Sequence, residues 1–547
     1  MLEGGANLRI VKTDNGEMII NGIRLSPKQS EIVKYDGNIV VSASAGTGKT
    51  RTMVSKIVYD LERNKTHKVI AAITFTIKAT EEIRERLVLN VALNFIGTNN
   101  TFAIEEIIKP FMKDVYGDEY NIDFDTDYTN KDYKFDNFDD GITLMKDNET
   151  IYSYCTLRNC KRHNRDCSAQ KKNFVFELAL DIVKRSKACR LFLKAKYFSI
   201  YIDEYQDCDN EMHNFFMYLC SELGISTFIV GDSKQSIYRW RGAKPELFTD
   251  VVNNSTFKHF ILTENHRSSI NIQNYSNLLF ANTSGLYKKS KNEGDILVVK
   301  NTINWATIVV DLIDKEKSTG LLRAANEFTK NQKGGAKDGA ELLKQSGINF
   351  VYIPEAPIEQ ITTSSAWLYM AMARYIMLDG YSVYHFVEEV PVEGAIDKKA
   401  INTVKKYLTQ VKNNRTDEPK FTEAFKLLSI FFNCGAVDES HVAKLFETIS
   451  DSQYVASISE DLPTHSAMTL YKSKGLEFDQ TIIFFEDYAH SKKVNPEHIN
   501  NHYVACTRAK SKLIIVSTGH EDSKAFIAEL KKLMSDVNFG DLLTKVP

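Results

Sequence analysis

The chain has 547 residues, of which 43% are hydrophobic and 26% are charged, and its formal net charge is −2. This length predicts roughly two to four domains, and the composition is typical of a globular protein. The near-zero net charge excludes a protein that is basic over its whole surface, as histones are. Any surface that binds nucleic acid must therefore be a local basic patch. There is no run of 18 apolar residues, no signal-peptide core and no compact disulfide framework among the eight cysteines. We therefore expect a cytoplasmic protein that does not enter a membrane.

Four short apolar runs in the first half of the chain each end in a polar motif. They lie at residues 39–41, 69–73, 200–202 and 228–230. Runs of this kind, alternating with amphipathic segments, are typical of buried parallel strands. Two further runs, at 481–485 and 513–516, indicate that the pattern returns near the end of the chain. Because ligands bind beyond the carboxyl ends of parallel strands, we expect the four polar motifs to meet.

Two segments interrupt this pattern. Residues 103–189 contain an acidic stretch at 117–149 and a basic run at 158–172, and residues 353–455 look mostly helical. We interpret both segments as insertions, so the predicted fold class is α/β, with two parallel-sheet domains that each carry a mainly helical inserted subdomain. The expected boundaries are 1–102 and 190–255 for the first domain, 103–189 for its insertion, 256–352 and 456–547 for the second domain, and 353–455 for its short insertion.

A phosphate-binding loop is predicted between the first strand and the helix that follows it. Its sequence is Ser44-Ala45-Gly46-Thr47-Gly48-Lys49-Thr50. The glycines let backbone N–H groups face phosphate oxygens, and the helix N-terminus adds a favourable dipole. We expect Lys49 to reach the β- and γ-phosphates and Thr50 to bind Mg²⁺. Ala43 replaces the first glycine of the usual pattern, but the strand–loop–helix context supports a nucleotide site.

An acidic pair follows a second buried strand. Hydrolysis of a nucleotide needs a metal anchor and a group that activates water. Asp203 suits the Mg²⁺ role and Glu204 the water-activating role, because both directly follow the apolar run at 200–202.

Further motifs resemble those of the UvrD/Rep-like DNA helicases of superfamily one, in the same order. They are SPKQ at 26–29, TFTIKAT at 74–80, GTNNTF at 97–102, GDSKQSIYRWRGA at 231–243, TENHRS at 263–268, TLYKSKGLEF at 469–478 and YVACTRAK at 503–510. This resemblance implies two RecA-like motor domains that use ATP with Mg²⁺ and move 3′ to 5′ on DNA.

The chain is more closely similar to one branch of this family, the UvrD-like subunits of the Gabija antiviral defence system. The similarity extends to strings outside the general motifs, such as KYFSIYIDEYQD and EEIIKPFMKDVYG. No nuclease constellation follows the motor motifs. The resemblance therefore implies a separate nuclease partner, GajA, in a hetero-oligomer.

The resemblance also implies roles around the nucleotide. Gln29 would contact the adenine edge, Arg51 would line the pocket, Gln235 would lie near the γ-phosphate and Glu477 would meet the ribose. Arg267 and Arg508 would be arginine fingers from the second domain, of a kind worth about 10³–10⁵ in rate in related chemistry. A surface salt bridge is the alternative for each arginine.

His266 replaces the tyrosine that stacks on adenine in the family. Imidazole stacks over a smaller area than phenol, so we hypothesise relaxed base selectivity, with other NTPs or dNTPs as substrates.

Nine residues are implied as contacts to a DNA single strand or end. They are Phe75, Thr76, Lys78, Thr98, Phe102, Tyr238, Trp240, Arg241 and Lys474. Aromatic faces stack on bases of any sequence, and polar groups bind phosphates. For Phe75 and Phe102 core packing is an equal alternative.

Two other functions stay open. The chain could be a DNA-end-sensing NTPase that depletes nucleotides with little unwinding, an alternative that His266 and the short second insertion favour. It could also be a DNA-binding scaffold for the nuclease, but the complete catalytic set argues against this. The spacings of Cys155, Cys160 and Cys167 do not match zinc pairs, and we expect no metal there.

Overall fold

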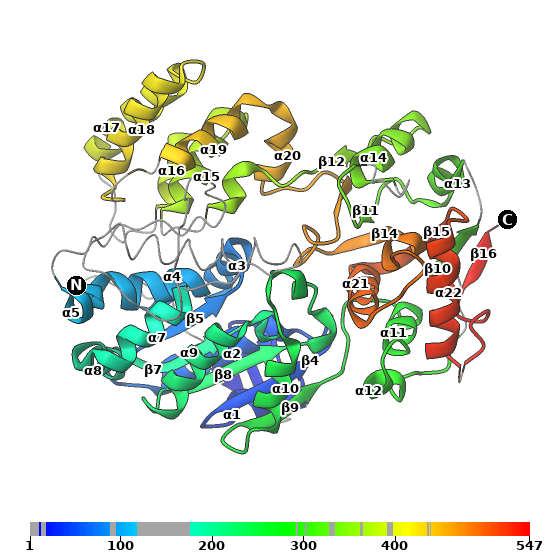
Figure 1. Cartoon of the computed structure of the whole chain (residues 1–547), viewed down its shortest axis with the longest axis horizontal. Helices are drawn as coiled ribbons and strands as arrows, with labels where there is room; N and C mark the ends of the chain where they lie inside the picture. Colours follow the sequence, from blue (N-terminus) through cyan, green and yellow to red (C-terminus); the bar gives the residue numbers. More distant parts are fainter. Residues whose placement is uncertain are drawn as a thin grey trace, which may run out of the picture.

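The computed structural model of the chain forms two parallel sheets and a separate group of helices (Figure 1). It describes residues 10–12, 18–87, 94–117, 175–290, 294–300, 304–327, 334–361, 365–390, 398–434, 437, 439–535 and 537–546. Residues 118–149 of the acidic stretch, the basic run, and the three cysteines at 155, 160 and 167 lie outside the described residues.

The first sheet has six parallel strands. Their order across the sheet is β6 (Phe95–Thr98), β5 (Val69–Thr74), β7 (Tyr197–Ile202), β8 (Ser226–Gly231), β4 (Ile39–Ala43) and β9 (Lys258–Leu262). The four apolar runs predicted in the first half of the chain are β4, β5, β7 and β8, so those predictions are confirmed. β9 pairs with β4, with Ile39 opposite Lys258. The sheet therefore extends past residue 255, where we expected the first domain to end.

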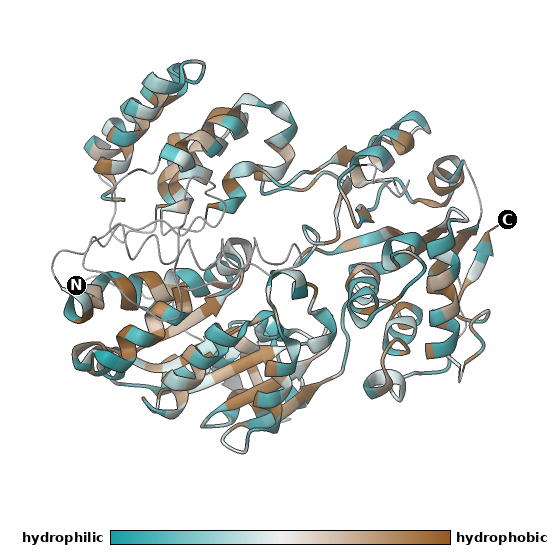
Figure 2. Ribbon diagram, viewed as in Figure 1, coloured by the Kyte–Doolittle hydropathy of each residue, from teal (hydrophilic) through white to brown (hydrophobic). Residues whose placement is uncertain are grey.

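The apolar runs are continuous because both faces of the first sheet are covered. Successive residues of a strand point to opposite faces. Val40 and Ile73 belong to one hydrophobic core, whereas Val41 and Ala72 belong to a second core on the other side. Figure 2 shows these strands as hydrophobic and the helices that cover them as amphipathic. Burial on both faces explains why the sequence shows no alternation of apolar and polar residues.

The helices of this half of the chain lie around the first sheet. They are α1 (Pro27–Lys34), α2 (Lys49–Arg63), α3 (Ile77–Leu87), α4 (Asn99–Ala103), a π-helical turn (Ile104–Ile108), α5 (Lys109–Tyr116), α7 (Val175–Arg185), α8 (Lys187–Lys196), α9 (Asn210–Ser221) and α10 (Pro245–Asn253). The first helix begins with a complete capping box. The Ser26 hydroxyl accepts from the Gln29 N–H, and the Gln29 side chain accepts from the Ser26 N–H.

The second sheet has seven parallel strands. Their order is β12 (Val351–Tyr352), β13 (His465–Thr469), β11 (Thr319–Arg323), β14 (Phe478–Phe484), β15 (Ala509–Ser517), β10 (Ile296–Lys300) and β16 (Thr544–Val546). The predicted late strands correspond to β14 and β15. Helices α11 (Ile270–Asn277), α12 (Ala281–Ser284), α13 (Trp305–Leu312), α14 (Ala336–Gln345), α21 (Pro496–Cys506) and α22 (Glu521–Leu533) accompany this sheet. Again, neighbouring strand residues such as Ile482 and Ile483 enter different cores.

A helical group lies between β12 and β13 in the chain and has its own hydrophobic core. It contains α15 (Ala366–Met377), α16 (Val383–Glu388), α17 (Lys398–Asn413), α18 (Glu418–Phe431), α19 (Glu439–Ser450) and α20 (Val455–Ile458). In Figure 1 this group lies above the first sheet. A small antiparallel sheet, β1 (Ile10–Lys12), β2 (Met18–Ile20) and β3 (Ile23–Arg24), completes the described strands. Among the described helices, none has the length and apolarity needed to cross a bilayer.

Phe102 is a core residue of the first sheet and not a surface for stacking on bases. Its side chain is 0% exposed, and its ring packs 5.1 Å from Phe95 and 5.7 Å from Tyr197, centroid to centroid. The DNA contact implied for Phe102 is therefore corrected. The alternative of core packing describes this residue, because α4 turns the ring inward beneath β6.

Phe102→Ala is expected to lower the free energy of unfolding by about 3–5 kcal/mol, because it removes a large buried ring and leaves a cavity. Urea unfolding measures the change. The control is Leu191→Ala on α8, where the side chain is 58% exposed, and about 0.5 kcal/mol or less is expected. A Phe102→Ala protein of unchanged stability that loses DNA affinity would restore the stacking role.

Candidate nucleotide site

The predicted phosphate loop is a tight turn between β4 and α2. Gly46 and Gly48 have φ values of 73° and 81°, in the left-handed region that favours glycine. The Thr47 hydroxyl closes the turn by donating to the Ser44 carbonyl at 2.8 Å. A Cβ atom on Gly46 would lie 2.4 Å from Oδ1 of Asn265, so a side chain has no room there. The loop thus exposes backbone N–H groups at the start of α2, as a phosphate site requires.

Asp203 and Glu204 lie beside this loop at the carboxyl end of β7. The Thr50 hydroxyl donates to Oδ2 of Asp203 at 3.2 Å. Lys49 Nζ bonds Oε1 of Glu204 at 2.9 Å. Glu204 has a φ of 50°, an unusual conformation for a residue with a side chain, which turns its carboxylate toward the loop. Four predicted site residues that are far apart in the sequence are therefore brought together.

The two carboxylates experience different electrostatic surroundings. Burial acts to raise the pKa of Glu204, but the ammonium groups of Lys49 and Lys474 outweigh burial and lower the pKa below its ordinary value. Burial and the neighbouring charge of Glu204 raise the pKa of Asp203. The geometry keeps Glu204 ionised, with one oxygen facing Lys49 and the other facing Lys474 at 3.4 Å.

Lys474 belongs to the second sheet's half of the chain, yet it lies among carboxylates of the first. Its Nζ bonds Asp207 and Glu204, and its side chain is only 10% exposed. Burial acts to lower the pKa of Lys474, but Asp207 and Glu204 raise it above the ordinary value. Burial raises the pKa of Asp207 to about 6. The structure thus places Lys474 in an ion pair that joins the two halves of the site, and the DNA-phosphate contact expected for it stays a prediction.

The two predicted arginine fingers lie next to each other. Arg267 donates to the Thr507 carbonyl at 3.2 Å and forms an ion pair with Glu477. Arg508 is 3% exposed and donates to the Val504 and Leu476 carbonyls at 3.2 Å each. Burial, followed by the like charge of Arg267, lowers the pKa of Arg508 to about 10. Arg267 therefore forms the salt bridge considered as its alternative, with the exposed Glu477, whereas Arg508 is buried against backbone carbonyls.

The segment that carries Arg267 also covers the phosphate loop. The His266 N–H donates to the Gly46 carbonyl at 2.9 Å, while the His266 side chain is half exposed. Gln29 is buried, and its amide also donates weakly to the Thr47 carbonyl at 3.4 Å. Arg51, on the first turn of α2, donates to the Arg24 carbonyl. Gln29 and His266 thus contact the loop directly, Arg51 lies beside Gly48, and Glu477 pairs with Arg267.

Gln235 belongs to a buried polar network. Its side-chain amide donates to Oδ2 of Asp232 at 2.8 Å, and the Asp232 N–H donates to Oε1 of Gln206 at 2.9 Å. The Gln206 amide in turn donates to Glu204. The sequence did not single out Asp232 or Gln206. Both lie inside motifs named in the sequence analysis, so their positions in these motifs could have identified them as site residues.

An aromatic and cationic cluster lies next to Lys474. Trp240 is 46% exposed and meets Tyr471 edge to face at 5.7 Å. The Arg241 guanidinium lies 4.6 Å above the Trp240 ring, and Lys474 Nζ lies 5.0 Å from the centre of the Tyr238 ring. The cluster offers an exposed ring and an adjacent cation, which are the elements of single-strand binding.

The remaining DNA candidates lie on the first sheet. Phe75 is half-buried against the core, and Thr76 is exposed, with its hydroxyl accepting from the Ala79 N–H at 3.2 Å. Thr98 caps α4 by accepting from the Thr101 N–H. The side chain of Lys78 lies outside the described residues. These placements put Thr76 on the surface and give the Thr98 hydroxyl a capping role.

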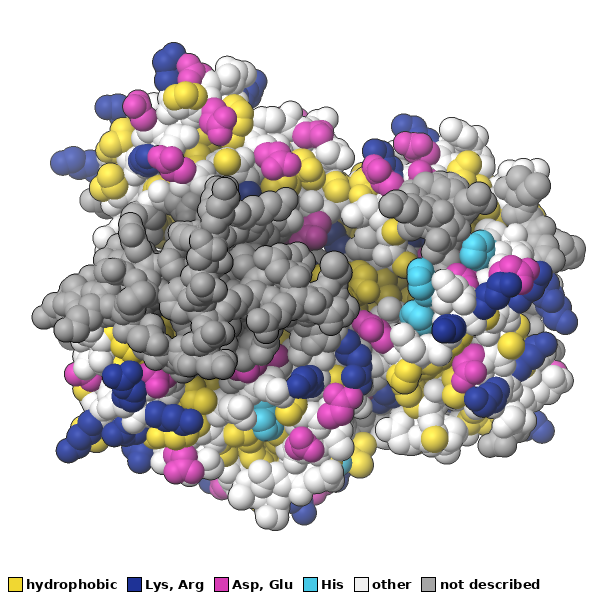
Figure 3. Space-filling view, in the orientation of Figure 1, with side chains coloured by type: hydrophobic (Ala, Val, Ile, Leu, Met, Phe, Trp, Pro, Cys, Tyr) yellow, Lys and Arg dark blue, Asp and Glu magenta, His cyan; other side chains and the backbone are white. Residues whose placement is uncertain are grey.

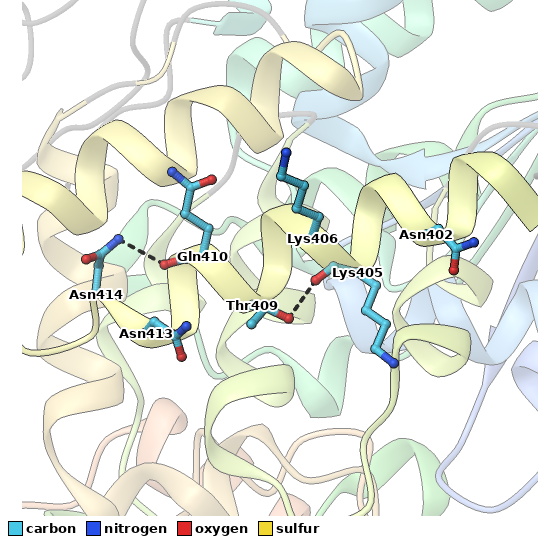
Figure 4. Close-up of a pocket in the computed structure, with 7 residues that line it drawn as sticks. All are labelled: Asn402, Lys405, Lys406, Thr409, Gln410, Asn413 and Asn414. Atoms are coloured by element: carbon cyan, nitrogen blue, oxygen red, sulfur yellow. Dashed lines mark hydrogen bonds between the residues drawn. The ribbon is translucent and has the colours of Figure 1, made fainter.

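Two surface hollows lie away from the phosphate loop. One is an open polar depression along α17 (Figure 4), lined by Asn402, Lys405, Lys406, Thr409, Gln410, Asn413 and Asn414. The other, of about 320 Å³, includes Asp36, Lys56 and Asp60. Neither contains a residue of the phosphate loop. The described residues contain no cluster of three or more His, Cys, Asp or Glu side chains that could hold a metal by themselves.

Comparisons with known proteins agree with this geometry. The family model of the UvrD/REP helicase N-terminal domain matches residues 25–148 and 98–256, and that of the UvrD-like helicase C-terminal domain matches residues 465–516. The Gabija protein GajB of Bacillus cereus (strain VD045) is 36% identical over 521 residues, which cover 95% of this chain and 100% of that protein.

More distant relatives are helicases. The ATP-dependent DNA helicase PcrA of Bacillus subtilis (strain 168) is 23% identical over 92% of this chain and 85% of its own length. The ATP-dependent DNA helicase Rep of Escherichia coli (strain K12) is 26% identical over 49% of this chain and 45% of its own length. The two parallel sheets are RecA-like motor domains, and the chain belongs to the UvrD-like helicase family as a nucleotide-hydrolysing enzyme of the DNA helicase type.

Proposed function

We propose that the chain is a DNA-dependent ATPase that moves 3′ to 5′ along a single strand and acts in antiphage defence with a nuclease partner of the GajA type. The observation that carries the catalytic part is the meeting of Lys49 and Thr50 with Asp203 and Glu204 at one edge of the first sheet. The similarity to GajB over nearly the whole chain supports the defence role, which we place in the cytoplasm.

The first motor domain, in this proposal, comprises residues 1–102 and 190–262. The second comprises 263–352 and 456–547, and residues 103–189 and 353–455 are their insertions. The change from our expected boundary follows the pairing of β9 with β4.

Thr50 and Asp203 fit a magnesium ion. Mg²⁺ prefers oxygen ligands, and here a hydroxyl and a carboxylate oxygen lie 3.2 Å apart beside the phosphate loop. Asp203 is buried next to a second carboxylate, which raises its pKa and so favours a cation nearby. When bound with a nucleoside triphosphate, Mg²⁺ would neutralise phosphate charge.

Glu204 is positioned to accept a proton from water. Its oxygens are held by Lys49 and Lys474. Lys49 would exchange Glu204 for phosphate oxygens, because the loop holds it at the start of α2. This exchange leaves one oxygen of Glu204 for a water molecule. Arg267 and Arg508 would then stabilise the charge that develops on the transferred phosphoryl group.

DNA is expected to act through the cluster around Trp240. Lys474 touches the Tyr238 ring of this cluster and bonds the catalytic Glu204. A strand that stacks on Trp240 would therefore contact the cluster that includes Lys474, and so alter the ion pair between Lys474 and Glu204. Positive and negative side chains are interspersed on the face shown in Figure 3, which agrees with a local rather than a global nucleic-acid surface.

Glu204→Gln is expected to reduce kcat by about 10²–10⁴-fold, because an amide keeps a hydrogen bond but cannot accept the proton from water. Nucleotide affinity should change only a few-fold. Phosphate release with saturating ATP and single-stranded DNA measures the loss. The matched control is Glu222→Gln at the exposed end of α9, which should retain full activity. A Glu204→Gln protein with more than a tenth of the original rate contradicts the assignment.

Trp240→Ala is expected to weaken single-stranded DNA binding by about 5- to 100-fold, since stacking is worth about 1–3 kcal/mol per base. The rate without DNA should be preserved. Fluorescence anisotropy with a labelled oligonucleotide measures the affinity. Tyr384→Ala serves as the control, because Tyr384 is an exposed aromatic residue of α16, in the helical group. Equal DNA affinities for the two variants would exclude Trp240 as a stacking residue.

A second candidate is an NTPase that senses DNA ends and depletes nucleotides with little unwinding. Two observations favour it. His266 is half exposed over the loop where the family has a stacking tyrosine, and both ends of the Gln29 amide are already hydrogen-bonded within the protein. The site therefore offers few free groups that could distinguish adenine from other bases.

A panel of NTPs and dNTPs, assayed with single-stranded DNA, blunt duplex and closed circular duplex, separates the two candidates. The second candidate predicts that nucleotides with several different bases are hydrolysed at rates within about tenfold of one another. Free DNA ends should stimulate this hydrolysis, and little strand should be displaced. Strict use of ATP with rapid strand displacement would exclude the end-sensing NTPase and support the translocating motor. The same panel, repeated with a purified GajA-type nuclease, tests whether the partner changes either result.

A further inference from the structure

A tyrosine from the second motor domain is hydrogen-bonded directly to the phosphate loop. Tyr503 lies on α21 and is 1% exposed. Its hydroxyl accepts from the Ala45 N–H at 3.1 Å and donates to Oδ2 of Asp232 at 3.3 Å. Ala45 and Asp232 belong to two different loops of the first domain. One hydroxyl group therefore connects three segments that are distant in the sequence.

Asp232 is the anchor of this connection. Its Oδ1 pairs with Lys234 Nζ at 2.7 Å, and the same ammonium donates to the Ser44 hydroxyl at 3.2 Å. Its Oδ2 accepts from Gln235 at 2.8 Å as well as from Tyr503. The carboxylate thus holds both Gln235 and, through Lys234, the beginning of the phosphate loop. Tyr503 is the contribution of the second domain to this arrangement.

A second residue of the same helix contacts the same loop. The Asn500 side-chain amide donates to the Ser236 carbonyl at 3.1 Å and to the Ser233 carbonyl at 3.4 Å. Asn500 and Tyr503 are three residues apart, so they lie on one face of α21. Arg508 follows shortly after the end of this helix. Helix α21 therefore carries the residues that contact the first domain and its phosphate loop, and it leads directly to the predicted arginine finger Arg508.

We infer that Tyr503 is a positioning residue whose hydroxyl sets the phosphate loop and Gln235 when the two motor domains are together. The inference rests on the proposed function, because it concerns regulation of the same hydrolytic site. When the domains separate, the Ala45 N–H and one oxygen of Asp232 lose this partner. Asp232 keeps its bond from Gln235, but the Ala45 N–H loses the one side-chain acceptor that fixes its direction. The loop is then less well arranged for phosphate.

Tyr503→Phe removes the hydroxyl and keeps the ring. We expect the Kd for a fluorescent ATP analogue to rise about tenfold, which is the effect of losing a buried hydrogen bond. The stimulation of hydrolysis by single-stranded DNA should fall by a similar factor. Tyr275→Phe is the matched control, because Tyr275 is also a buried tyrosine of the second domain, and its hydroxyl lies 2.9 Å from Nε2 of His502. This control should lower the melting temperature without changing either nucleotide measurement by more than twofold.

Asn500→Ala separates the hydroxyl from the domain contact in general. It removes two hydrogen bonds of α21 but leaves the Ala45 N–H bonded, so the Kd for the ATP analogue should stay within twofold of the original. The inference is overturned if Tyr503→Phe matches Tyr275→Phe in both nucleotide measurements. It is also overturned if Asn500→Ala raises the Kd as much as Tyr503→Phe. A parent protein that binds the analogue but never hydrolyses NTP sinks the proposed function, while the Kd values still test Tyr503.

Discussion

The buried charge of Glu204 is the constraint on which the rest of the site depends. A carboxylate taken out of water is strongly destabilised unless cations and hydrogen bonds compensate. Here Lys49 comes from the phosphate loop and Lys474 from the other motor domain, and each neutralises one oxygen. The first domain supplies Lys49 and the Gln206 amide to this carboxylate, and the second domain supplies its second cation. The surroundings of Glu204 are consequently complete only when the two domains are in contact, which is the arrangement that our proposal of DNA-dependent turnover requires.

Around this charge, several side chains of the second domain approach the phosphate loop of the first. Tyr503 bonds Ala45 of that loop, and Arg267, in the segment between β9 and α11, lies against Gly46. The aromatic cluster at Trp240 touches the same Lys474 that holds Glu204. The proposed nucleotide and strand sites and the domain contact are thus close neighbours. Coupling of this kind needs no long pathway, because the interacting groups are immediate neighbours.

Much of this arrangement was predictable from the sequence. Strands β4, β5, β7 and β8 are apolar because both sheet faces are covered, and each ends in a polar motif. β9 was missed, since an edge strand with exposed Lys258 and Ile261 has no continuous apolar run. For Phe102 the sequence left DNA contact and core packing as equal alternatives, and the fold decides for the core. The ion pair of Lys474 with Asp207 was not predictable, because these residues are far apart in the sequence. Cross-domain partners such as Tyr503 and Ala45 are 458 residues apart, and spacing carries no information about such contacts.

The link between the two motor domains has a mechanical consequence. All described strands of the first sheet precede residue 263, and all those of the second follow residue 295. The chain thus passes from one sheet to the other through the segment that carries His266, whose N–H is bonded to Gly46. The connection between the two sheets and the segment bonded to the phosphate loop are therefore the same piece of backbone. A substitution that shifts this connection would therefore act on the phosphate loop through a single backbone hydrogen bond.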